Sequence, residues 1–343
     1  MLCIAKPSER ILIIGIGGGG DIASAAALSS VLEEWGFETV LASIAWERYI
    51  HDPIPGPIEL DNIYSFVEKG EGFVIVNESS YAIRGGRRID FQATRVARCL
   101  RREIYIIDLY GGVTGFYSAL KHIVKREDID LIIGLDVGGD SLATGCEENL
   151  WSPLADWIGL AGLSLMKGIL AVHSPGSDGE LSQSYILKRI DDFSRKGALR
   201  GVKYMCKKEA DMLEKLLEHV YSEASRIPLL AYRGKRGIYE IRKGSRKTKI
   251  TIFNTITFFL DTEILVNDIK PVKALLTTRS LREARSILHD YGIYTEYDLE
   301  EDLYKSGLST QDITGDLLVE IRDRGRKNIR DNAIYKYCTG PGD

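Results

Sequence analysis

The sequence has no long hydrophobic run. Apolar segments such as residues 11–16 stop at glycines, so none reaches the roughly 18 apolar residues of a membrane helix. The first ten residues combine a short apolar start with Lys6, Glu9 and Arg10, without a separate hydrophobic region and a small-residue cleavage site. We therefore expect a cytoplasmic protein with no membrane anchor.

The sequence also lacks an excess of positive charge and any close pair of cysteines. With 45 basic and 49 acidic residues the formal net charge is −4, so a nucleic-acid partner is not favoured, although basic residues cluster at 84–88 and 233–246. No C-x-x-C pair is present, so neither a zinc site nor a disulfide framework is predicted. We expect ordinary buried thiols at Cys3, Cys99, Cys146, Cys206 and Cys338.

Amide side chains are scarce. Three glutamines and seven asparagines stand against 94 charged residues, which is the pattern of proteins with few heat-labile amides and many ion pairs. This composition predicts a hyperthermophilic source, in which an intracellular disulfide would be less surprising.

Glycine, by contrast, is abundant, with 34 residues, and many glycines follow apolar, β-branched runs. Residues 11–14 break into a glycine loop that leads to an Ala- and Leu-rich stretch, which predicts a strand, a loop and a helix. The same order recurs along residues 104–196. We predict an α/β fold for residues 8–200, with a Rossmann-like, doubly wound, mostly parallel sheet and with the glycine loops at its carboxyl edge. A smaller α+β lobe, residues 201–335, is expected to pack on it.

The C-terminal lobe has a different character. A charged helix is predicted over residues 207–225, followed by basic, threonine-rich alternation over 237–259 that predicts antiparallel strands. Residues 273–278 predict one more strand. Ser280 and Glu283 have the spacing of a capping box and predict a helix that starts there.

The first glycine loop satisfies the pattern G-x-G-x-x-G between a predicted strand and a predicted helix. Such loops usually hold a phosphate at the helix N-terminus, but a carboxylate at Asp21 would occupy that position. Either a metal ion bridges Asp21 to a phosphate, or the ligand is a polyol or an amine. The alternative is a tight turn in which Asp21 only caps the helix. The candidate binding residues are Gly15, Gly17, Gly18, Gly19, Gly20 and Asp21.

A second candidate binding segment, Trp46, Glu47 and Arg48, follows the next predicted strand. An aromatic ring, an acid and a guanidinium at the carboxyl end of a strand could hold a base, a sugar or a phosphate. The alternative is a surface ion pair of Arg48 with Asp52 or Glu47, with Trp46 packed in the core.

Carboxylates accumulate in the loops after two later strands. Asp136 and Asp140 flank a glycine turn and could share one hard cation such as Mg²⁺. Asp178 and Glu180 are candidate catalytic acids or bases, and Asp156 is expected at the same edge. So much like charge in one cleft would raise pKa values unless cations offset it. The alternatives are helix N-caps at Asp140 and Asp156 and a side-chain turn at Asp178.

Two weaker candidates complete the set. Gly111 and Gly112 resemble a backbone nest for an anion, with a tight turn as the alternative. His173 closes its predicted strand and could be a general base or a satisfied edge histidine. No G-x-S-x-G, Walker lysine or H-E-x-x-H motif is present, so α/β-hydrolase, P-loop and zincin mechanisms have no support.

At these residues the chain resembles an uncharacterised prokaryotic family known as domain of unknown function 1152. The resemblance implies that the segment after residue 237 belongs to the same unit, and it brings no assigned reaction or catalytic residue. It rests on residues 17–21, 46–48, 52–57, 111–112, 136–140, 176–181, 280–284 and 292–296.

The sequence thus predicts an enzyme that binds a nucleotide or a phosphorylated metabolite, with Mg²⁺ at Asp136 and Asp140. The main alternative is a non-catalytic sensor or scaffold that binds a small molecule and acts as a homo-oligomer. A third hypothesis, an oxidoreductase that uses NAD or another dinucleotide, rests on the glycine motif alone.

Overall fold

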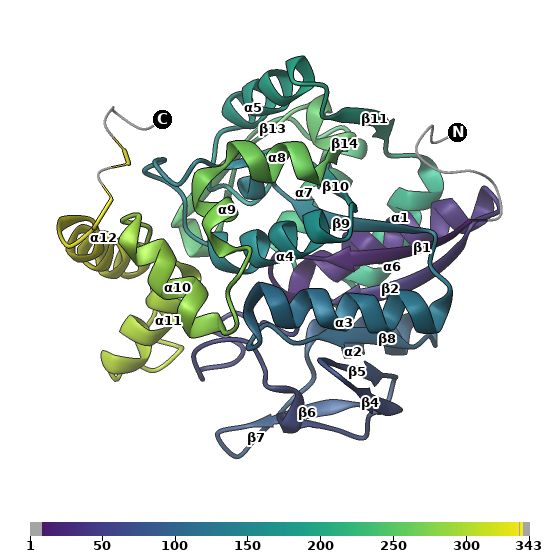
Figure 1. Cartoon of the computed structure of the whole chain (residues 1–343), viewed down its shortest axis with the longest axis horizontal. Coiled ribbons are helices and arrows are strands. Elements are labelled where there is room, and N and C mark those ends of the chain that lie inside the picture. The colour runs from purple at the N-terminus through teal and green to yellow at the C-terminus, as the bar shows by residue number, and fades with distance from the viewer. Residues whose placement is uncertain (1–8, 336, 339–343) are drawn as a thin grey trace.

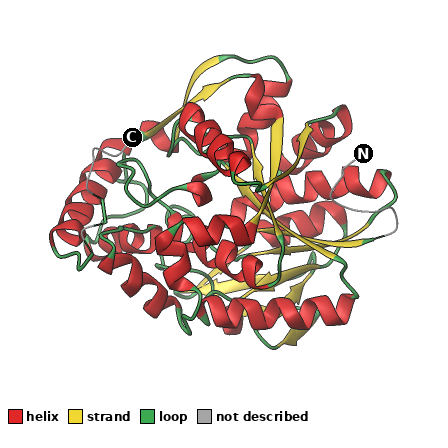
Figure 2. Cartoon of the chain, turned by 45° about the horizontal axis from the view of Figure 1, so that its top comes forward, coloured by secondary structure: helices red, strands yellow, loops and turns green. Residues whose placement is uncertain are grey.

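A nine-stranded sheet lies at the centre of the computed structural model, which describes residues 9–335, 337 and 338. Helices cover both faces of this sheet (Figures 1 and 2). The five central strands are parallel and lie in the order β8 (Ile104–Ile107), β2 (Glu38–Ser43), β1 (Arg10–Gly15), β9 (Leu131–Val137) and β10 (Ile169–His173). Antiparallel strands extend one edge with β5 (Phe73–Val76) and β4 (Glu68–Gly70) and the other with β14 (Ile256–Asp261) and β11 (Leu199–Tyr204).

The central strands are apolar on both faces because each face packs on helices. In β1, Leu12 and Ile14 belong to one buried cluster, and Ile11 and Ile13 belong to the other. The first cluster includes side chains of α3 (Gly112–Glu127), α4 (Pro153–Leu165), α5 (Gln183–Arg195), α8 (Thr262–Asp268), α9 (Lys270–Leu275) and α10 (Leu281–Asp290). The second includes side chains of α1 (Ile22–Glu34), α2 (Gln92–Leu100), α6 (Lys207–Leu217) and α7 (Glu223–Tyr232). The predicted α/β class with a parallel sheet centre is confirmed.

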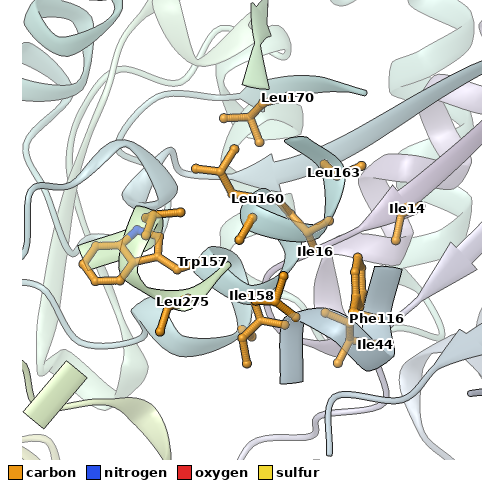
Figure 3. Packing of buried hydrophobic residues seen from close by; sticks show 14 of the residues in the cluster. Ile14, Ile16, Ile44, Phe116, Trp157, Ile158, Leu160, Leu163, Leu170 and Leu275 are labelled. Carbon is orange, nitrogen blue, oxygen red and sulfur yellow. The ribbon is translucent and has the colours of Figure 1, made fainter. Parts of the chain in front are cut away.

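Phe116 is one of the largest fully buried side chains of the first cluster. Figure 3 shows its ring close to Ile14 and Ile44. A Cβ atom at Gly162 in α4 would lie 2.4 Å from Cδ1 of Phe116, so the close packing of this ring on α4 requires a glycine.

The C-terminal helices α11 (Glu296–Lys305) and α12 (Gly315–Asp331) group beside α10 at one end of the molecule (Figure 1). The predicted antiparallel strands are confirmed as the hairpin of β12 (Gly237–Ile241) and β13 (Arg246–Ile250). The helix predicted over 207–225 is two helices, α6 and α7. A small sheet of β3 (Ile63–Tyr64), β6 (Tyr81–Arg84) and β7 (Arg87–Ile89) lies in the segment between β2 and β8.

The strand predicted over residues 273–278 is wrong. The first half of that segment, residues 273–275, belongs to α9, which begins with Lys270 and Pro271. Proline is favoured in the first turn of a helix, and the buried Val272 and Leu275 have helical spacing. The helix predicted to start at Ser280 is confirmed as α10. The Ser280 hydroxyl accepts the backbone N–H of Glu283 at 3.1 Å and caps this helix.

The prediction of unpaired thiols is wrong for two cysteines. Cys146 and Cys338 form a disulfide across 192 residues of sequence, a pairing that spacing along the chain cannot reveal. Cys99 and Cys206 are free and partly buried, and Cys3 lies outside the described residues.

No helix in the described part of the chain is both long enough and apolar enough to cross a bilayer.

Replacing Phe116 with alanine is expected to lower the free energy of unfolding by about 3–5 kcal/mol, because it removes a buried ring and leaves a cavity. Urea unfolding measures this change. The matched control is Phe66→Ala, since Phe66 is 40% exposed and its loss should cost less than about 0.5 kcal/mol. Equal losses in the two variants would contradict this account of the core.

Candidate functional site

The loops that follow β1, β9 and β10 meet at one edge of the sheet because these three strands are parallel neighbours. They surround a cavity of about 420 Å³, which we call the acidic cavity. Its lining includes Gly17, Gly18, Gly19, Gly20, Asp21, Trp46, Glu47, Arg48, Asp136, Asp140, Asp156, Asp178 and Glu180. The structure therefore brings together most of the candidate residues from the sequence.

Six buried carboxylates of this cavity form two groups of three. Oxygens of Asp21, Asp136 and Asp156 lie within 4.8 Å of one another. Oxygens of Asp140, Asp178 and Glu180 lie within 4.8 Å of one another as well. We call these groups the first and second carboxylate triads. Asp136 and Asp140, which the sequence placed on one cation, belong to different triads.

The crowding of these carboxylates changes their protonation. Burial, followed by the negative charge of neighbouring carboxylates, raises the pKa of Asp21, Asp140, Asp156 and Asp178 well above the ordinary value. The pKa of Asp136 is also raised by burial, while hydrogen bonds oppose the shift. Without a cation, these five aspartates therefore retain protons at pH values at which isolated aspartates release them.

Hydrogen bonds satisfy some of these carboxylates and leave others open. Asp136 accepts the N–H groups of Gly139 at 3.1 Å and Ser141 at 3.2 Å, together with the Ser141 hydroxyl. By contrast, Oδ1 of Asp156 and Oδ2 of Asp178 are buried and have no hydrogen-bond partner. Unsatisfied buried oxygens of this kind are costly unless a ligand meets them. Hydrogen bonds thus hold the carboxylate of Asp136 in place, whereas Asp156 and Asp178 each have one oxygen without a hydrogen bond that could bind a ligand.

Asp21 does not have the capping role that was the alternative to ligand binding. Its side chain makes no capping hydrogen bond to α1. Instead, Oδ2 accepts the N–H of Gly17 at 3.3 Å and that of Val137 at 3.4 Å, which links the loop after β1 to the end of β9. The Asp21 carboxylate therefore belongs to the cavity. At Asp178 the side-chain turn given as the alternative is present, because Oδ1 of Asp178 accepts the N–H of Glu180 at 3.4 Å.

Glu180 is the most firmly held carboxylate of the second triad. It accepts the backbone N–H groups of Trp151 at 2.6 Å and Ser152 at 3.0 Å, as well as the Ser152 hydroxyl. Arg246 forms an ion pair with it at 2.7 Å. These contacts fix the orientation of Glu180.

Trp46, Glu47 and Arg48 connect the cavity to other parts of the chain. The buried Trp46 donates its Nε1–H to Glu300, and Glu47 accepts two N–H groups of Gln92 at 2.9 and 2.7 Å. A Cβ at Gly19 would lie 2.9 Å from Oε1 of Glu47, so the glycine permits a close approach of the two loops.

Arg48 pairs with neither of the partners that the sequence suggested. Its Nη1 lies 2.6 Å from Glu223, at the start of α7. His51, also in the lining, stacks on Tyr221 with 5.2 Å between ring centroids. The C-terminal lobe thus closes this side of the acidic cavity.

Sequence reasoning missed a set of basic side chains in the cavity lining. Arg242 and Arg246 each have a buried Nε with no hydrogen-bond partner. The signal in the sequence is the basic cluster at 233–246, which we considered only for nucleic-acid binding. The basic members of the lining are Arg48, Arg226, Arg242, Lys243 and Arg246.

Sequence reasoning also missed Glu296 and Glu300 in α11, which line the same cavity. Glu296 accepts two N–H groups in the first turn of α4, at 3.0 and 2.8 Å, and burial raises its pKa to about 7. Glu300 accepts the N–H of Gly56 at 2.8 Å, and burial raises its pKa to about 8. The available signal is their spacing of four residues, which places two carboxylates on one face of a helix.

Three candidates lie away from the cavity lining. Gly15 packs on α1, where an added Cβ would lie 2.9 Å from the N of Ile22. Gly111 and Gly112 belong to the turn into α3, and a Cβ at Gly112 would lie 2.8 Å from the backbone N of Ser280. The tight-turn alternative accounts for these three glycines.

His173 is a buried histidine that is hydrogen-bonded through Nδ1 to Thr257 at 2.8 Å. Burial lowers its pKa to about 3, so it stays neutral at physiological pH. It does not line the acidic cavity.

The fold and the site define an α/β protein with a carboxylate-rich cavity at the ends of its parallel strands. The chain belongs to the family described as protein of unknown function (DUF1152), whose model matches residues 12–304. No curated protein and no solved structure matches the chain.

The raised pKa values predict how the stability of the metal-free protein depends on pH. The unfolded chain releases these carboxyl protons at lower pH than the folded chain does, so the free energy of unfolding falls as pH rises above the ordinary aspartate pKa. Asp156→Asn removes one of these groups and should raise the melting temperature in EDTA more at pH 8 than at pH 5.

Thermal unfolding at the two pH values measures this effect, and Asp61→Asn is the control because the Asp61 side chain is 81% exposed. A melting-temperature difference between Asp156→Asn and wild type that is the same at pH 5 and pH 8 would contradict the prediction.

Proposed function

We propose that the protein is an Mg²⁺-dependent enzyme that acts on a nucleotide or a phosphorylated metabolite in the acidic cavity. The observation that carries this proposal is the composition of the lining, in which two buried carboxylate triads share one cavity with five basic side chains. Carboxylates are ligands for hard cations, and guanidinium groups bind phosphate.

The order of the parallel strands supports the proposal. Numbered along the chain, the five strands lie in the order 3-2-1-4-5, and this order supports our proposal of a Rossmann-like, doubly wound sheet. The chain leaves β1 toward β2 on one side and later adds β9 on the other side. Ligands of such sheets bind at the carboxyl ends of the strands where the order reverses. Asp21 follows β1 there, and Asp136 is near the end of β9.

Each triad offers three oxygen ligands, and Mg²⁺ completes such a set with water and substrate phosphate. The first cation would bind Asp21, Asp136 and Asp156. A second would bind Asp140, Asp178 and Glu180. Paired cations supply charge stabilisation for an attacking and a leaving oxygen in phosphoryl transfer.

The basic side chains would hold the phosphate in place of the glycine loop. Two N–H groups of that loop are already used, since Gly17 donates to Asp21 and Gly19 donates to the carbonyl oxygen of Trp46 at 2.9 Å. The Nε groups of Arg242 and Arg246 are buried donors in the lining that have no hydrogen-bond partner.

Proton transfer has candidates in both parts of the site. Glu296, with a pKa of about 7, changes its protonation near neutral pH, as a general acid or base must. Asp178 keeps a free oxygen for the same purpose, whereas the four donors to Glu180 favour a ligand role for it. An NAD-dependent reaction is less favoured, because the carboxylate of Asp21 lies in the glycine loop that would hold the pyrophosphate.

Calorimetric titration with Mn²⁺ or Mg²⁺ tests the cation sites. We expect binding that releases protons at pH 7, because the cation displaces protons from the triads. Asp156→Asn and Asp178→Asn should each weaken the affinity at least about tenfold. Asp61→Asn is the control, and unchanged affinity in both cavity variants would overturn the cation assignment.

Catalysis is tested by incubating the protein and Mg²⁺ with a panel of phosphorylated metabolites and nucleotides. We expect product from at least one of them, detected as released phosphate or by mass spectrometry, and no product with Asp156→Asn. Tight binding of a panel member without turnover would instead support a non-catalytic sensor.

A further inference from the structure

A second cavity, of about 720 Å³, adjoins the acidic cavity. We call it the basic groove. The two share Trp151, Glu180, Ser245 and Arg246 in their linings, so a ligand longer than one phosphate group could contact both. The far side of the groove is formed by α12.

Three arginines of α12 point their guanidinium groups at one segment of the chain. Arg322 donates to the carbonyl oxygen of Leu150 at 3.1 Å, Arg326 to that of Glu147 at 3.2 Å, and Arg330 to that of Cys146 at 3.1 Å. A guanidinium has five N–H donors. In the described part of the chain, Arg326 and Arg330 each use one of these donors in a hydrogen bond to a carbonyl oxygen, which leaves other donors for a ligand.

The groove has more positive charge than its own acids neutralise. Burial and the nearby charges of Arg330 and Arg322 lower the pKa of Arg326 to about 10. Lys327 lies on the same helix and is exposed in the groove. A bound anion would relieve the repulsion among these cations.

The wall between the two cavities contains a stack of charged and aromatic groups. The guanidinium of Arg246 lies 4.7 Å from the ring centroid of Trp151, and that of Arg322 lies 4.5 Å from it. Both arginines have a buried Nε with no hydrogen-bond partner. These two donors flank Trp151 where the cavities adjoin.

We propose that the basic groove binds the distal phosphates of a polyphosphate ligand, such as a nucleoside triphosphate, whose other end enters the acidic cavity. The inference rests on the proposed function for the orientation of that ligand, and it narrows the substrate class to molecules with two or more linked phosphates. A nucleic acid is not favoured, because Glu148, Asp323 and Asp331 interrupt the basic lining and would repel a long backbone.

The test is calorimetric binding of inorganic tripolyphosphate, ATP and orthophosphate in EDTA, so that no cation contributes. We expect tripolyphosphate and ATP to bind at least about tenfold more tightly than orthophosphate, with affinity that falls as salt rises. The double variant Arg326→Gln/Lys327→Gln should lose about tenfold in tripolyphosphate affinity. Lys327→Gln alone keeps the test valid if the double variant does not fold, and it should weaken binding in the same direction.

The control is Lys121→Gln/Lys125→Gln, which makes the same change of charge on exposed residues of α3 outside both cavities. Equal tripolyphosphate affinities in the two double variants, or tighter binding of a single-stranded oligonucleotide than of ATP, would overturn the proposal. Asp156→Asn separates the two proposals, because it should lose Mn²⁺ binding and keep tripolyphosphate binding in EDTA.

Discussion

Repulsion among six buried carboxylates is the interaction on which the arrangement of the acidic cavity depends. Parallel strands bring the loops after β1, β9 and β10 to one edge, and these loops provide four of the six carboxylates. Asp136 lies near the end of β9 itself, and Asp156 lies in the first turn of α4. Burial and mutual repulsion make this charge unfavourable. Backbone N–H groups and Arg246 offset part of it at Asp136 and Glu180, but Asp156 and Asp178 keep open oxygens. A cavity with unmet acceptors in this position is suited to a cation.

The C-terminal lobe completes the site that the sheet begins. Glu223 in α7 holds Arg48, and Arg246 in β13 holds Glu180. Glu300 in α11 accepts N–H groups from Trp46 and from Gly56. Gly56 lies in a proline-rich loop, and Arg84 donates to the carbonyl oxygens of residues 54–57 in this loop. Strand β14 of the same lobe pairs with β10 inside the main sheet. The lobe and the sheet therefore share hydrogen bonds, ion pairs and a cavity.

The parts of this fold that depend on local patterns could be predicted, and those that depend on distant partners could not. Apolar runs that end in glycine predicted the parallel strands and the edge where Asp21, Asp136 and Asp178 meet, because strand direction fixes that edge. Which carboxylates share a triad depends on side-chain direction in three dimensions, so Asp136 and Asp140 could not be separated from their spacing alone. Arg246 and Glu296 reach the cavity through tertiary packing, which leaves no signal near the acids in sequence.

Helix α12 lies beyond residues 12–304, which the family model matches, yet three of its arginines donate to carbonyl groups just before Trp151 and Ser152. The disulfide from Cys146 to Cys338 fastens the same segment to the chain end. The N–H groups of Trp151 and Ser152 in turn fix Glu180. A shortened chain that stops at residue 304 would thus retain all six acids while losing the clamp that orients one of them. The contacts that hold the acidic cavity therefore extend beyond the residues that the family model matches.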